Sequence, residues 1–128
     1  YVAFGAMFIG FITLIGAAIG LMNIMLVQVN ERTREIGVSM AIGANRATIR
    51  SQFLIESIVI CIIGGICGIL LGIFIGNFVA LALNASFILP WLWILVGLTV
   101  CVITGVAAGY MPARRASKLD PIEALRYE

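Results

Sequence analysis

Four charged residues close together follow a long uncharged stretch, and this boundary constrains the fold more than any other feature. Residues 1–30 have no charged side chain and are mostly apolar, whereas residues 31–35 include Glu31, Arg32, Arg34 and Glu35. A helix of about 20 apolar residues satisfies its backbone inside a bilayer but cannot bury such a cluster there. The cluster therefore marks a membrane face, where a compact charged element offers a surface to a partner.

Composition indicates the same class. The chain is 62% hydrophobic and 11% charged, whereas soluble domains are about 25% charged. A net charge of +2 does not suggest nucleic acid as a partner. The chain has no histidine and no phosphate-binding G-x-x-x-x-G-K-[ST] motif. We interpret Cys61, Cys67 and Cys101 as small apolar helix residues rather than redox or metal groups, so we expect neither an enzyme nor a cofactor or metal site.

Three apolar runs are long enough to span a bilayer. They cover about residues 1–29, 53–83 and 91–110, and the polar and proline-containing turn at 84–90 separates the last two. We predict that residues 1–128 form an all-α integral membrane domain with three transmembrane helices. Region 31–52 and the tail 111–128 would each add a short helix outside the membrane.

The distribution of basic residues predicts the orientation. All of them lie in 31–52 or 111–128, and the 84–90 turn has no charge. Because basic loops stay on the cytoplasmic side, both regions should be cytoplasmic in a multi-pass protein of the cell membrane.

Glycines recur every four residues along the predicted spans. In lipid, small residues allow helix backbones to approach closely, so this spacing favours packed interfaces over glycines that are merely frequent. The partner helix could belong to this chain or to another subunit. The predicted packing glycines are Gly16, Gly20, Gly64, Gly68, Gly72, Gly76, Gly105 and Gly109.

Residues 33–42 are predicted to form a short helix across the inner membrane face. Ile36 and Met40 share one side of it, and Arg32 and Glu35 flank that side. Such an apolar side must meet a membrane surface, a neighbouring helix or a protein groove. Gly43 is a natural helix stop, and residue 45, an asparagine, would cap the next helix.

The tail also carries local structural signals. We expect Pro112 to open a basic turn that contains Arg114 and Arg115. Asp120, the proline after it and Glu123 are typical of the start of a helix. In the second span, we interpret Glu56 as reaching toward the interface or pairing with Gln52.

Several motifs in order resemble the membrane domain of MacB-type ABC transporter permeases, within the FtsX-like permease superfamily. They are MNIMLV at 22–27, ERTREIG at 31–37, AIGA at 41–44, QFLIE at 52–56, PARRA at 112–116 and LDPIEAL at 119–125. The resemblance covers nearly the whole chain, which would correspond to the last three spans of a four-span permease.

The resemblance implies that this domain transmits movement. The spans would carry ATP-driven movement across the membrane to support efflux, acting with a fused or separate ABC ATPase, a second permease copy, the lipid bilayer and, in Gram-negative relatives, a periplasmic adaptor. The 33–42 helix would be the coupling helix, with the tail beside it. The implied ATPase-coupling residues are Arg32, Arg34, Glu35, Ile36 and Met40, and the implied tail contacts are Arg114, Arg115, Asp120 and Glu123.

Two other functions fit the same residues. One is an FtsX-like permease that regulates an extracytoplasmic hydrolase, although the 22–27 run favours the MacB-type branch. The other is a membrane scaffold subunit that transports nothing. An intramembrane enzyme fits least, because the spans contain no Ser/His or paired-carboxylate arrangement.

Overall fold

The computed structural model describes residues 1–126, so the last two residues of the predicted tail lie outside the described residues. Five helices follow one another: α1 (Val2–Glu31), α2 (Thr33–Ala41), α3 (Arg46–Ala82), α4 (Trp91–Ser117) and α5 (Pro121–Arg126). Residues 1–126 contain no strand. The all-α prediction is confirmed.

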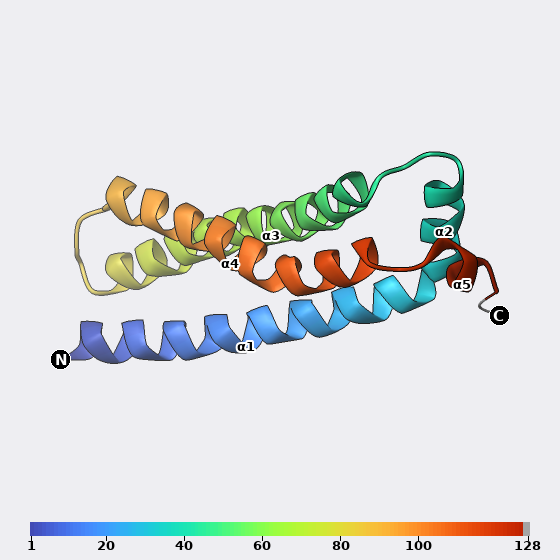
Figure 1. Ribbon diagram of the computed structural model, residues 1–128. Coiled ribbons are helices and arrows are strands. Elements are labelled where there is room, and N and C mark those ends of the chain that lie inside the picture. The colour runs from blue at the N-terminus through green and yellow to red at the C-terminus, as the bar shows by residue number, and fades with distance from the viewer. Residues whose placement is uncertain (127–128) are drawn as a thin grey trace.

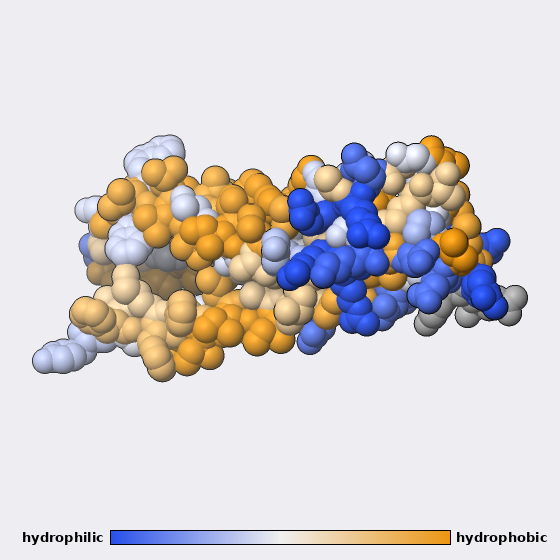
Figure 2. Space-filling model, viewed as in Figure 1, coloured by the Kyte–Doolittle hydropathy of each residue, from blue (hydrophilic) through white to orange (hydrophobic). Residues whose placement is uncertain are grey.

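Three of the helices, α1, α3 and α4, are long and apolar enough to cross a membrane, as predicted. Helices α3 and α4 form an antiparallel hairpin, and α1 lies along α4 (Figure 1). None of the most apolar stretch of α1 or α3 is buried within the chain. Figure 2 shows this apolar surface as an orange belt over the long helices.

The two short helices lie together at one end of the molecule, opposite the α3–α4 turn (Figure 1). Local chemistry explains where α2 stops. Gly43 adopts φ +111°, and the N–H groups of Gly43 and Ala44 donate to the carbonyls of Met40 (3.2 Å) and Ser39 (3.0 Å). The Asn45 side chain then accepts a hydrogen bond from the Thr48 N–H at 2.8 Å and caps α3, as expected.

The expected turn at Pro112 is wrong. Helix α4 continues through Pro112 to Ser117, seven residues past the predicted end of the third span. Proline removes one helical hydrogen bond. Pro112 is nevertheless fully buried, and Ala113 and Ala116, which follow it in α4, pack in the core. Tertiary packing therefore holds the helix where the local rule predicts a break.

The core lies near the α2 end of the bundle rather than at the middle of the spans. Four helices meet there, and each contributes buried side chains: Met25 and Val29 from α1, Ile36 from α2, Ile49 and Phe53 from α3, Ala113 and Ala116 from α4. We call this set the junction core. It ties the short helix α2 to all three long helices.

Candidate functional site

The inner side of α2 packs on the junction core. Ile36 is only 4% exposed and lies in the same cluster as Met25 and Phe53, and Met40 packs against that cluster. Ile36 and Met40 therefore share one face, as the sequence predicts, but this face is covered by neighbouring helices of the same chain. Ile36 is therefore enclosed within the chain, whereas Met40 remains partly exposed.

The outer side of α2 is what remains accessible. Arg34, Glu35 and Val38 are exposed, and Ile42 at its end is 83% exposed. An isoleucine so accessible and outside the spanning segments has no apolar cover among residues 1–126. The exposed face thus combines two apolar residues with a pair of opposite charges.

Helix α5 is joined to α2 through a very close contact. A Cβ placed on Gly37 would lie 2.7 Å from the Cβ of Ala124, and Ala124 is 2% exposed. The start of α5 follows the prediction, because Asp120 Oδ1 accepts a hydrogen bond from the Ile122 N–H at 2.9 Å. Sequence reasoning missed the Gly37–Ala124 pair, although a glycine inside a helix costs about 1 kcal/mol and so signals a close approach.

The exposed residues of α2 and α5 together form a surface that we call the end platform. On α5, Ile122 is 71% exposed and Leu125 is also exposed, so both apolar side chains are accessible. The end platform comprises Arg34, Glu35, Val38, Ile42, Ile122 and Leu125.

An ion pair links the α1–α2 junction to α3. Arg32 Nη1 lies 3.9 Å from Glu56 Oε2, and both side chains are partly exposed. The structure therefore gives Glu56 a partner from another helix, where the sequence suggested Gln52 of its own helix. At this exposure the pair contributes at most about 1 kcal/mol, so it orients the junction more than it stabilises it.

The predicted tail residues divide between two places. Arg115, Asp120 and Glu123 line a small pocket of about 280 Å³ together with Thr33 at the start of α2 and Ala124 of α5. Arg114 is exposed in the last turns of α4 and does not line this pocket. Within residues 1–126, no group of histidine, cysteine, aspartate or glutamate side chains is arranged to hold a metal ion.

Two of the predicted packing glycines lie in the α3–α4 interface. A Cβ on Gly105 would lie 3.0 Å from the Ile58 Cα, and one on Gly109 would lie 2.6 Å from the Ser57 Cβ. The buried Ser57 hydroxyl donates to the Gly105 carbonyl at 3.0 Å, with the Leu54 carbonyl also within reach at 2.8 Å. Ser57 had not been expected from the sequence.

The remaining predicted glycines have no close neighbour among residues 1–126. A Cβ on any of them would meet nothing within 4 Å; they are Gly16, Gly20, Gly64, Gly68, Gly72 and Gly76. Gly64 and Gly68 line an apolar groove of about 800 Å³ between α1 and the α3–α4 hairpin. Gly72 and Gly76 line a hollow of about 430 Å³ below the α3–α4 turn.

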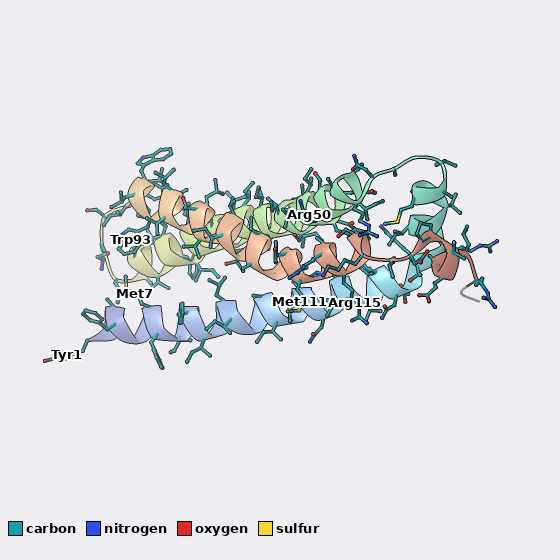
Figure 3. All side chains as sticks on the ribbon, in the orientation of Figure 1. Tyr1, Met7, Arg50, Trp93, Met111 and Arg115 are labelled. Carbon is teal, nitrogen blue, oxygen red and sulfur yellow. The ribbon has the colours of Figure 1, made fainter. Side chains whose placement is uncertain are left out.

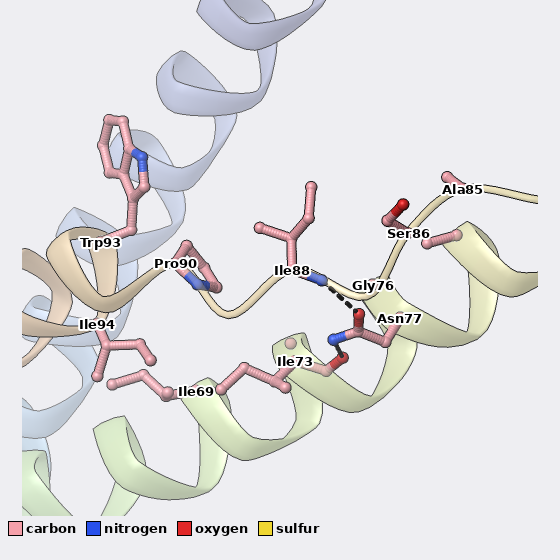
Figure 4. A pocket seen from close by; sticks show the side chains of 12 residues that line it. Ile69, Ile73, Gly76, Asn77, Ala85, Ser86, Ile88, Pro90, Trp93 and Ile94 are labelled. Carbon is pink, nitrogen blue, oxygen red and sulfur yellow. Dashed lines mark hydrogen bonds between the residues drawn. The ribbon is translucent and has the colours of Figure 1, made fainter.

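The side-chain amide of Asn77 holds the turn over this hollow (Figure 4). Asn77 Oδ1 accepts a hydrogen bond from the Ile88 N–H at 3.3 Å, and Asn77 Nδ2 donates to the Ile73 carbonyl at 2.9 Å. The turn therefore closes the end of the hairpin without any charged residue. It lies at the opposite end of the molecule from the end platform (Figure 1).

Comparison with known proteins gives consistent matches. A family model described as FtsX-like permease C-terminal matches residues 7–121. The chain is 50% identical over 121 residues to the macrolide export ATP-binding/permease protein MacB of Mannheimia succiniciproducens, covering 94% of this chain and 19% of that protein. It is 51% identical over 122 residues to MacB of Bordetella avium, with the same coverage. MacB of Campylobacter jejuni is 52% identical over 118 residues, covering 91% and 18%. The chain thus spans about a fifth of the length of these relatives.

Proposed function

Because this chain belongs to the FtsX-like permease family, we propose that it transmits ATP-driven conformational change across the membrane in a MacB-like ABC exporter. The chain is a transporter's permease portion with three helices able to span a membrane. Its relatives are named ATP-binding/permease proteins. We infer that an ABC ATPase domain or subunit acts on the end platform and that the movement supports efflux.

The observation that carries this proposal is the junction core. Ile36 of α2 is buried in one apolar cluster with side chains of α1, α3 and α4. Protein interiors are close-packed and stiff, so a displacement of α2 is passed to all three long helices rather than absorbed locally. The inward face of α2 therefore transmits movement, and its outward face receives it.

The outward face suits a protein partner. Ile42 and Val38 of α2 and Ile122 of α5 are exposed apolar residues outside the spanning segments. A few such residues usually supply most of the binding energy of an interface, while charges such as Arg34 and Glu35 at the edge set its orientation. The close contact between α2 and α5 would make both helices move as one body under load.

The orientation and assembly follow from the same proposal. The end platform would face the cytoplasm, where the ATPase is, and the basic residues near it agree with this side. A second permease copy would cover the α3 glycines that have no close neighbour among residues 1–126, such as Gly68.

The experiment replaces Ile42 by aspartate in the full-length protein. Ile42→Asp should weaken ATPase docking about 30-fold, because loss of an interface hot spot costs about 2 kcal/mol. Transport in cells and transport-linked ATP hydrolysis in vesicles should fall while membrane expression stays normal, since Ile42 is exposed. Met40→Asp would be a poorer test, because Met40 packs on the junction core and its loss would also unfold the site.

The matched control is Ala47→Asp, an exposed residue at the start of α3 that receives the same charge outside the end platform. It should retain transport. If Ile42→Asp transports normally, or if both variants lose transport equally, α2 does not dock the ATPase.

A further inference from the structure

A second surface, formed by basic residues of α3 and α4, lies outside the end platform. Two basic residues lie one helical turn apart on α3, Arg46 and Arg50, and two more lie one turn apart at the end of α4, Arg114 and Lys118. All four are exposed. We call them the basic collar.

The pairing of α3 with α4 sets the members of the basic collar at matching heights. The Ser57 hydroxyl contacts the Gly105 carbonyl, and Gly109 also abuts Ser57, so Ser57 lies level with the middle of that stretch of α4. Because a helix rises about 1.5 Å per residue, Arg50 and Arg114 both lie about 10 Å from this level, toward the α2 end. The same reasoning places Arg46 and Lys118 one turn further out.

The basic collar has no acidic partner within the part of the chain that the structure describes. The ion pair found among residues 1–126 joins Arg32 to Glu56 and includes no member of the collar. Figure 2 shows hydrophilic residues gathered where the apolar belt ends, and Figure 3 places Arg50 and Arg115 at this height. The four cations of the collar thus lie at similar heights without an ion-pair partner among the described residues.

The neighbours of the basic collar identify the occupant. Ile55, Tyr110 and Met111, which lie about one turn further along the spans, are 57%, 52% and 59% exposed. Such side chains at the edge of a spanning helix are covered by acyl chains, so the groups beside the collar are lipid headgroups. A soluble partner that approaches along the bundle axis meets α2 and α5 first, because these helices form the end of the molecule (Figure 1).

We propose that the basic collar binds the headgroups of anionic phospholipids in the leaflet nearest the end platform. Each basic residue near an anionic membrane surface strengthens binding by about 1 kcal/mol, which is roughly a five-fold change. This inference does not depend on ATPase docking, and it requires only that the three long helices span the membrane.

The test uses the full-length protein reconstituted in vesicles of phosphatidylcholine with one-fifth phosphatidylglycerol. After extraction, mass spectrometry counts the two lipids that remain bound to the protein. Wild type should retain phosphatidylglycerol above its bulk share. Arg50→Gln and Arg114→Gln should each lower its retention roughly five-fold, without changing that of phosphatidylcholine. Arg50→Lys should keep most of it, because the charge is preserved.

The matched control is Arg126→Gln, which removes the same charge from exposed α5 beyond the collar. It should retain phosphatidylglycerol like wild type. The proposal is overturned if wild type shows no enrichment, or if Arg126→Gln loses as much lipid as Arg50→Gln. It is also overturned if Arg50→Gln keeps its lipid but no longer binds the ATPase, since the collar would then be a protein interface. A loss of transport in Ile42→Asp with normal lipid retention would leave this proposal intact.

Discussion

The contact between Gly37 and Ala124 allows the joining of α2 and α5 to be tested by compensation. Gly37→Ala adds a Cβ that would lie 2.7 Å from the Ala124 Cβ, well inside van der Waals contact. Overpacking of this kind typically costs 1–3 kcal/mol. Helix α5 has six residues and one buried residue, Ala124, so it should detach rather than distort α2.

Hydrogen exchange of the full-length protein in nanodiscs measures this detachment. The Ala124 N–H donates to the Asp120 carbonyl at 2.9 Å in the docked helix. A loss of about 2 kcal/mol should speed exchange of the α5 amides about 30-fold in Gly37→Ala. Ala124→Gly alone should have a smaller effect, and the double variant should recover protection because the added and removed methyl groups occupy the same space.

Two results would refute this reasoning. One is wild-type exchange of α5 in Gly37→Ala, which would mean that the close contact does not exist in the membrane. The other is a double variant that exchanges as fast as Gly37→Ala, which would mean that the two residues act independently.

Three further predictions concern stability and topology. Gly109→Ala should loosen the α3–α4 hairpin by about 1–3 kcal/mol in thermal unfolding, whereas Gly68→Ala should leave that stability unchanged, because nothing in the described part of the chain lies within 4 Å of a Cβ at Gly68; equal effects would contradict the interface. Ile36→Ala should cost about 2–5 kcal/mol by emptying the junction core, and a neutral result would remove Ile36 from it. In a background without the native cysteines, a cysteine at Ser86 should react with an impermeant maleimide in intact cells and one at Lys118 should not; the reverse pattern would invert the orientation.

Features that depend only on residues close in the sequence could be predicted. The change from apolar to charged residues at Glu31 marks the end of α1, and the Gly43 and Asn45 signals mark the turn before α3. Asp120 likewise starts α5. Each is a backbone conformation or a hydrogen bond formed within a few residues, so the residue type suffices.

Features that depend on packing could not be predicted in the same way. An i, i+4 apolar pair such as Ile36 and Met40 shows that one face needs cover, but not whether the cover is the same chain or a partner. Pro112 shows the same limit, since its burial in the bundle overrides its tendency to end a helix.

Glycine spacing was equally ambiguous. The four-residue period is the same from Gly64 to Gly76, where the described residues place nothing close by, and at Gly105 and Gly109, which pack closely. Ser57 and Gly68 lie on nearly the same side of α3, so the path of α4 across α3 decides which of them it meets. The contact runs from Ser57 to Gly65, whose added Cβ would meet Cys101, and leaves Gly68 outside it. That path is set by many side chains together and is not visible in a local pattern.

The central claim is that force on α2 moves the far ends of the spans. It is tested most directly by spin labels on cysteines at Phe4 and Ala85, exposed residues near the start of α1 and in the α3–α4 turn, with the native cysteines removed. Pulsed electron resonance on the full-length protein in nanodiscs would give the distance between the labels with and without ATP. We predict that ATP shifts this distance and that Ile42→Asp abolishes the shift. An ATP-dependent shift that persists in Ile42→Asp, or no shift in the active wild type, would contradict the account.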